Sequence, residues 1–193
     1  MAKGPRCLQR EHLRRQARPA RPPDLHLIVL DTSGSMHQKG RLALAKGHVS
    51  RLIEQAARCG DHVALLSCGG QGVALQLPPA PARGSAKVQL RLLGGGGGTP
   101  LAAALRQADR LLRQAKGGPV LTRPRLGWLW LLTDGRTLEQ PAAPTGADRI
   151  VILDFDSERP AIGRCPDWAR AWRAEHHRAL APDGMPTQSH RPP

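Results

Sequence analysis

The sequence is poor in aromatic residues and lacks several patterns that define common protein classes. Of its 193 residues one is Phe, four are Trp and none is Tyr. Its longest apolar runs, such as residues 25–30 and 126–132, are far too short to cross a bilayer. The basic N-terminus has no apolar stretch of the kind found in secretory signals. From these absences we expect a cytoplasmic protein without a membrane partner.

Cysteine is also scarce, and its spacing indicates neither a zinc site nor a disulfide framework. The four cysteines are Cys7, Cys59, Cys68 and Cys165, and the nearest two are nine residues apart. Structural zinc sites use closely spaced pairs such as C-x-x-C, and this sequence has none. We therefore expect reduced, buried thiols.

Acidic residues are few relative to basic ones, 15 against 29, which gives a formal net charge of +14. Such a charge is typical of nucleic-acid binders, because Lys and Arg contact phosphates. The sequence lacks a zinc finger, a helix-turn-helix pattern and the aromatic residues that stack on RNA bases. We therefore favour an acidic protein partner, and nucleic-acid binding is the least favoured alternative.

Composition divides the chain into three parts. Residues 1–23 hold seven Lys or Arg and end in a proline-rich stretch, which predicts a basic N-terminal arm. Residues 182–193 are rich in Pro, His and polar residues, which predicts a disordered C-terminal tail. Residues 24–181 are expected to form one domain.

Within residues 24–181, predicted strands and helices alternate. Apolar runs predict strands, and spacings of three and four predict helices; residues 84–93 fit either. Trp128 and Trp130 share one face of a strand and are expected in the core. His176 and His177 are expected on opposite sides of the last helix. The predicted strands are 25–30, 62–67, 73–77, 127–133 and 149–155, and the predicted helices are 41–58, 100–115 and 165–180.

This alternation predicts a doubly wound, Rossmann-like α/β fold. Strands that are joined through helices of this length run parallel and are covered on both faces. The short Gly-rich connection between 62–67 and 73–77 predicts an antiparallel hairpin. We expect a mostly parallel central sheet with one antiparallel edge strand and helices on both faces.

Three polar segments lie where the predicted strands end or a helix begins. Asp31-Thr32-Ser33-Gly34-Ser35-Met36 follows the first strand, and Thr133-Asp134-Gly135 follows the tryptophan-bearing strand. Gly94–Gly98 and Thr99-Pro100 come directly before a helix. Ligands of open α/β sheets collect beyond the carboxyl ends of the strands, where these segments can meet. Pro100 fits the first helical position, which predicts Thr99 as the N-cap.

The residue types in these segments suit a hard cation. Carboxylate and hydroxyl oxygens are the ligands that Mg²⁺ and Mn²⁺ prefer. We therefore predict that the ion is bound by Asp31, Ser33, Ser35, Thr99 and Asp134. The alternative is that these residues only cap helices in their loops. It is outweighed when all five residues are considered together.

Catalytic and nucleotide-binding interpretations are weaker. The glycine run has no Gly-Lys-Ser/Thr ending of a P-loop, so its glycines are expected to let the threonine loop move. No Gly-x-Ser-x-Gly elbow surrounds the serines, and His37 is expected to be a loop residue near the metal, not a base. Arg136 could meet an acidic partner, but a solvated side chain is favoured.

The ordered set Asp-x-Ser-x-Ser, Thr99 in a Gly-rich loop and Thr-Asp-Gly resembles the metal-ion-dependent adhesion site of von Willebrand factor A domains. The resemblance covers about residues 24–156. It implies that the serine and threonine hydroxyls bind the metal directly and that the aspartates often act through water. It also implies an open coordination position for a partner's Asp or Glu.

A narrower resemblance is to the C-terminal domain of the magnesium chelatase D subunit, here in a stand-alone form. It rests on five segments: Val29–Met36, Arg41 to Gly47, Gly60–Leu65, Leu77-Pro78-Pro79 and Gly97-Gly98-Thr99-Pro100-Leu101-Ala102. It implies a non-catalytic subunit of a magnesium or cobalt chelatase, the latter serving cobalamin synthesis. The implied partners are an AAA+ ATPase and the large chelatase subunit. The alternative is an interaction scaffold for another MoxR-type AAA+ ATPase or a surface complex.

Overall fold

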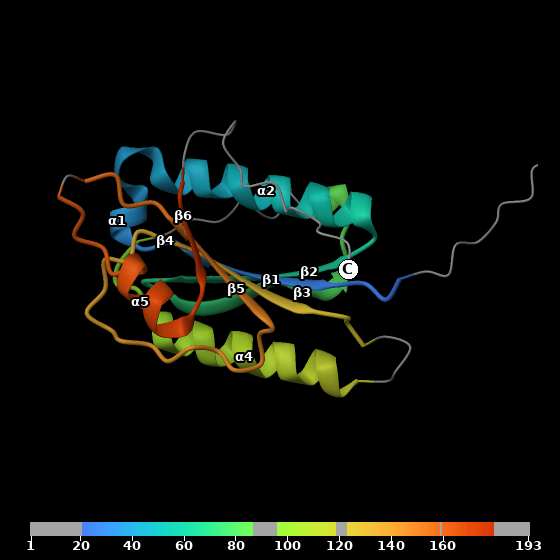
Figure 1. Ribbon diagram of the computed structural model, residues 1–193. Coiled ribbons are helices and arrows are strands. Elements are labelled where there is room, and N and C mark those ends of the chain that lie inside the picture. The colour runs from blue at the N-terminus through green and yellow to red at the C-terminus, as the bar shows by residue number, and fades with distance from the viewer. Residues whose placement is uncertain (1–20, 87–95, 119–122, 159, 180–193) are drawn as a thin grey trace, which may run out of the picture.

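The computed structural model describes residues 21–86, 96–118, 123–158 and 160–179 (Figure 1). Almost all of the predicted basic arm and the whole of the predicted tail lie outside these ranges. Of the ambiguous segment 84–93, only the first three residues are described, and they form a short 3-10 turn, η3 (Gly84–Ala86).

A six-stranded sheet forms the centre of the domain, in the order β3-β2-β1-β4-β5-β6. β3 pairs antiparallel with β2, and the four other strand pairs are parallel. This arrangement confirms the predicted sheet and its antiparallel edge strand. The strands are β1 (Leu25–Asp31), β2 (His62–Gly69), β3 (Gly72–Pro81), β4 (Gly127–Thr133), β5 (Arg149–Asp154) and β6 (Glu175–Arg178).

Helices cover both faces of the sheet, as predicted (Figure 1). α2 (Arg41–Cys59) lies on one face, and α4 (Leu101–Gly117) and α5 (Cys165–Trp172) lie on the other. The short α1 (Gly34–His37) and the 3-10 turn η2 (Gln38–Gly40) connect β1 to α2. The result is a three-layer domain with the sheet in the middle.

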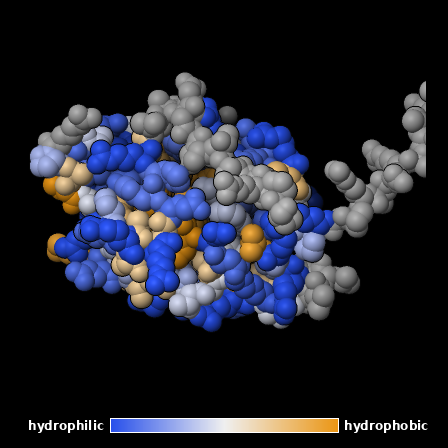
Figure 2. Space-filling model, viewed as in Figure 1, coloured by the Kyte–Doolittle hydropathy of each residue, from blue (hydrophilic) through white to orange (hydrophobic). Residues whose placement is uncertain are grey.

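Each helix buries the apolar stripe that its sequence predicts. In α2 the buried apolar residues are Leu42, Ala45, Val49, Leu52, Ile53 and Ala56, and in α4 they are Leu101, Ala104, Leu105, Ala108 and Leu112. All seven residues of β1 are buried, because this central strand is covered on both faces. Trp130 is also buried in the core, and half-buried Trp128 stacks against it. The face in Figure 2 is largely hydrophilic.

The strand order places a topological switch point at the carboxyl ends of β1 and β4. The chain leaves β1 toward β2 on one side and leaves β4 toward β5 on the other. Ligands of open α/β sheets bind at such a switch point. The predicted metal-binding residues Asp31 and Asp134 therefore lie on either side of it.

The prediction of a last helix over residues 165–180 is wrong. α5 ends at Trp172, because Arg173 adopts the left-handed conformation with φ of 54°, and the chain continues as β6. His176 lies on this strand with its Nε2 atom 3.0 Å from Asp154 Oδ2, so the two histidines are not on a helix.

One cysteine also differs from expectation: Cys59 is exposed, whereas Cys68 and Cys165 are buried free thiols. None of the described helices has the length and apolarity to span a membrane.

We predict that Arg173→Gly stabilises the domain by roughly 0.5–1 kcal/mol, because glycine adopts the left-handed region without the Cβ clash that arginine suffers. The free energy of unfolding in urea measures this change. The matched control is Arg170→Gly in the same helix, which should destabilise by about 1 kcal/mol because its backbone is helical. Equal destabilisation by both substitutions would contradict the account of how α5 ends.

Candidate metal centre

Asp31 is the last residue of β1, and its carboxylate is buried at the sheet's carboxyl edge. Oδ1 accepts a hydrogen bond from the Ser33 backbone N–H at 2.9 Å. Oδ2 accepts one from the Thr133 hydroxyl on the neighbouring strand at 2.6 Å. Burial raises the pKa of Asp31, while these hydrogen bonds oppose the rise and the charge of Asp134 adds to it. A nearby cation would favour the ionised carboxylate.

The two serines of the first loop lie with their hydroxyls together. Ser33 Oγ and Ser35 Oγ are 3.2 Å apart. Ser33 is buried and Ser35 is half-buried at the start of α1, where the buried Met36 anchors the turn in the core. A hydroxyl has two acceptor lone pairs, so this pair can still offer oxygens to a third atom.

Asp134 follows β4 and is fully buried. Its Oδ2 accepts a hydrogen bond from Arg41 Nη1 at 3.3 Å, and its Oδ1 accepts one from the Arg136 backbone N–H at 3.2 Å. Arg41 Nη1 also donates to the Ser35 carbonyl at 3.2 Å. Arg41, itself buried, therefore ties the loop after β1 to the loop after β4.

Thr99 lies half-buried on a loop that is docked on these segments through its glycines. The Gly34 N–H donates to the Gly97 carbonyl at 3.1 Å, and the Gly96 N–H donates to the Thr32 carbonyl at 2.9 Å. Thr99 is not the N-cap, contrary to prediction: α4 begins at Leu101 with Pro100 as its N-cap. In the first turn of α4, the N–H of Ala102 instead donates to Glu139 Oε2 at 2.6 Å.

The glycines of this loop allow it to pack closely against the β2–β3 turn, and that they also let the threonine loop move stays a prediction. Gly97 has φ of +71°, and a Cβ atom there would lie 2.6 Å from the Gly70 Cα. A Cβ on Gly70 would clash with the Gly96 carbonyl, to which the Gly70 N–H donates. Gly94 and Gly95 lie outside the described residues. The loop that carries Thr99 therefore packs directly on the β2–β3 turn.

The loop after β5 contributes residues that sequence reasoning missed. Asp156 Oδ1 accepts a hydrogen bond from Arg136 Nη2 at 2.6 Å, and its Oδ2 accepts from the N–H groups of Ile162 and Gly163, both at 2.8 Å. Burial opposes ionisation, but these hydrogen bonds hold the pKa of Asp156 well below its usual range. Arg136 is thus tied to its own chain, and the expectation of a solvated side chain is wrong.

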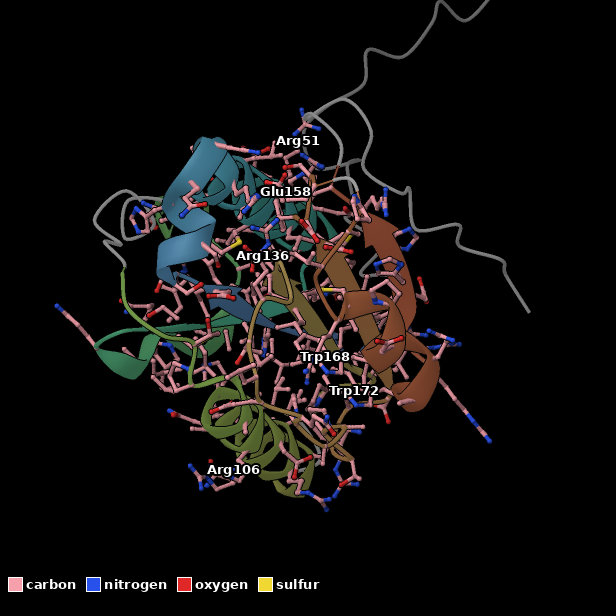
Figure 3. All side chains as sticks on the ribbon, turned by 90° about the vertical axis from the view of Figure 1, so that its left-hand side faces the viewer. Arg51, Arg106, Arg136, Glu158, Trp168 and Trp172 are labelled. Carbon is pink, nitrogen blue, oxygen red and sulfur yellow. The ribbon has the colours of Figure 1, made fainter. Side chains whose placement is uncertain are left out.

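Position along the chain could have revealed this loop. Asp156 and Glu158 follow a predicted strand, just as Asp31 and Asp134 do, and Asp154 lies near the end of that strand. Beyond Asp156, the side chain of Glu158 contacts Lys39, Arg41 and Arg136. In Figure 3, which looks onto this end of the molecule, Arg136 and Glu158 lie on the same side of the sheet.

The donor set fits a hard divalent cation. Asp31 supplies a buried carboxylate whose ionisation burial disfavours, and Ser33 and Ser35 supply neighbouring hydroxyl oxygens. Such oxygens suit Mg²⁺ or Mn²⁺. In the part of the chain that the structure describes, no group of three His, Cys, Asp or Glu could hold a metal, so the hydroxyls are essential to this candidate. His37 is exposed at the end of α1.

A doubly wound sheet whose central strands end in Asp-x-Ser-x-Ser and Thr-Asp-Gly loops defines the von Willebrand factor A class. The family model described as the von Willebrand factor type A domain matches residues 26–136. The chain belongs to this family.

Relatives of known sequence lie among magnesium chelatase subunits. The magnesium-chelatase 60 kDa subunit of Cereibacter sphaeroides is 42% identical over 110 residues, which cover 57% of this chain and 19% of that protein. The 67 kDa subunit of Chlorobaculum tepidum is 36% identical over 58% of this chain and 17% of that protein. An uncharacterized protein of Mycobacterium tuberculosis is 33% identical over 78% of this chain and 23% of that protein. The chain thus spans about a fifth of the length of these curated relatives.

Solved structures agree on the fold. A von Willebrand factor type A structure from Catenulispora acidiphila has a TM-score of 0.63 at 21% identity, over 84% of this chain and 40% of that chain. The SpRpn10 VWA domain has a TM-score of 0.57 at 14% identity, over 84% of this chain and 90% of that chain. At these identities the likeness concerns the fold only.

We predict that Gly97→Ala destabilises the domain by about 1–3 kcal/mol, because the added Cβ meets Gly70 and alanine is strained at positive φ. Urea unfolding measures the loss. The control is Gly84→Ala, where a Cβ meets nothing within 4 Å and φ is not positive. If the two variants were equally stable, the threonine loop would not be packed on the β2–β3 turn as described.

Proposed function

We propose that this domain is a non-catalytic, metal-dependent interaction module of a tetrapyrrole metallochelatase, of the magnesium or cobalt type. The observation that carries the proposal is the 42% identity to a magnesium-chelatase subunit over 110 residues. The matched segment of that subunit is a fifth of its length, so the match concerns one region of a larger protein. We assign this region the binding of a partner, and we place the domain in the cytoplasm.

The proposed site is a metal-ion-dependent adhesion site. Ser33 and Ser35 would bind Mg²⁺ or Mn²⁺ directly, and Asp31 and Asp134 would act partly through water. Thr99 would be the ligand whose coordination of the ion switches between states. The juxtaposed hydroxyls of the two serines and the buried carboxylate of Asp31 support this assignment. The bound ion would supply positive charge at the carboxyl ends of β1 and β4. The chain's own residues fix the loops: Thr133 orients Asp31, and Arg41 donates to both Asp134 and the Ser35 carbonyl.

The proposed partner is an AAA+ ATPase subunit that presents an Asp or Glu to the ion, with the large chelatase subunit as a second contact. A carboxylate is the natural ligand for an exposed position of a hard cation. The net charge of +14 also favours an acidic partner, because opposite charges accelerate encounter.

A second candidate is an interaction scaffold for another MoxR-type AAA+ ATPase or a surface complex outside tetrapyrrole metabolism. It is favoured by the uncharacterized M. tuberculosis protein, whose similarity extends over 151 residues, compared with 110 for the chelatase subunit. The two candidates share the metal site and differ in which ATPase binds.

We expect the purified domain to form a complex with the chelatase-type AAA+ subunit of the same genome in Mg²⁺ and to separate from it in EDTA. Sedimentation velocity measures the complex. Ser33→Ala should weaken the complex in Mg²⁺ at least about tenfold, because a direct ligand of the ion is lost. Asp31→Ala should act in the same direction.

The control is Ser50→Ala, which removes a hydroxyl from the middle of α2 that donates only to the Lys46 carbonyl among its described contacts. It should bind as the unmodified domain does. Association that is unaffected by EDTA and by Ser33→Ala would refute metal-dependent binding of the partner. Binding to a MoxR-type ATPase in place of the chelatase-type subunit would select the second candidate.

A further inference from the structure

Three cationic side chains converge on one oxygen beside the candidate metal centre. Glu158 Oε1 lies 2.7 Å from Lys39 Nζ, 3.0 Å from Arg41 Nη2 and 3.5 Å from Arg136 Nη2. We call Lys39, Arg41 and Arg136 the basic trio. Two members also contact Asp134, so the trio adjoins the metal centre directly.

Two members of the basic trio are more deeply buried than the carboxylate that they hold. The side chains of Arg41 and Arg136 are 3% and 17% exposed, and their guanidinium groups are held by Asp134 and Asp156. Glu158 is 34% exposed, and both Ser157 and Pro160 in the same loop are exposed. The cations therefore form a prebuilt site, and its present occupant lies on the surface.

Exposed apolar side chains lie on the two loops that flank this site. Leu138 is 92% exposed and Ile162 is 64% exposed. Their loops are joined, since the Arg164 N–H donates to the Gly135 carbonyl at 3.1 Å. Figure 2 shows apolar atoms within the hydrophilic surface at this end of the molecule.

We propose that the basic trio is a carboxylate-binding site for an acidic segment of the partner protein, and that Glu158 occupies it in cis until the partner displaces it. The inference rests on the proposed function, because it describes the partner's chemistry at the same edge of the sheet. The partner would present two carboxylates, one to the metal and one to the trio. Apolar residues beside the second carboxylate would cover Leu138 and Ile162.

A protein carboxylate fits this site better than a nucleic-acid phosphate. Glu158 already shows that a carboxylate oxygen can reach all three cations. A phosphate backbone would also leave the two apolar side chains uncovered.

The test uses a dye-labelled octaglutamate peptide, whose binding to the whole chain is followed by fluorescence anisotropy at low salt in EDTA. Glu158→Gln frees the trio and should tighten binding about two- to fivefold, the range of one partly exposed ion pair. Lys39→Gln in the Glu158→Gln background should cancel this gain, because it removes the most exposed cation of the trio.

Two controls separate the trio from net charge. Glu175→Gln removes the same charge from an exposed position on β6, and Arg106→Gln removes a cation from the exposed face of α4, far from Glu158 in Figure 3. Neither should change binding by more than a small fraction of the trio's effect. If Glu175→Gln tightened binding as much as Glu158→Gln, overall charge would explain the result and the proposal would be overturned.

An oligothymidylate of the same charge is the competing probe. An equal gain for this probe in Glu158→Gln would overturn the assignment of a carboxylate partner, and no gain supports it. Because the peptide is tested in EDTA, its binding to the basic trio is measured independently of the metal. Loss of Mg²⁺-dependent ATPase binding as an outcome would concern only the proposed function.

Discussion

The buried carboxylate of Asp31 is the constraint on which this edge of the sheet depends. Burying an ionised carboxylate costs several kcal/mol unless hydrogen bonds or opposite charges compensate it. Here the compensation comes from the Thr133 hydroxyl of the adjacent central strand and from the Ser33 backbone. These two bonds fix the ends of β1 and β4 relative to each other and turn the chain so that the Ser33 and Ser35 hydroxyls meet.

A second layer of alternating charges extends from this point toward the surface. Buried Asp134 is held by Arg41, and Arg136 bridges Asp134 and Asp156. Asp156 in turn binds the backbone of the β5–α5 loop. Removing one member of such a buried network leaves an unpaired charge, so the loops are coupled in stability. The network therefore links the candidate metal centre to the exposed Glu158.

The sequence was sufficient where a local pattern decides the structure, and insufficient where distant residues do. The apolar run of β1 and the stripe of α2 could be predicted because burial follows hydrophobic periodicity. The end of α5 could not, because a left-handed arginine carries no sequence signal comparable to glycine. At the start of α4 the sequence predicts Thr99 as the N-cap, whereas in the structure the Ala102 N–H donates to Glu139, 37 residues away. Arg41 belongs to the segments that resemble the chelatase subunit, but its contact with Asp134, 93 residues away, carries no local sequence signal.

The central claim is that the loops after β1 and β4 bind a divalent cation, and titration with Mn²⁺ tests it most directly. Electron paramagnetic resonance counts free Mn²⁺ in the presence of the purified domain. We expect one Mn²⁺ ion to bind and Mg²⁺ to displace it. Ser33→Ala should abolish this site, and Ser50→Ala should leave it intact. Absence of a bound ion, or a site that survives Ser33→Ala unchanged, would contradict it.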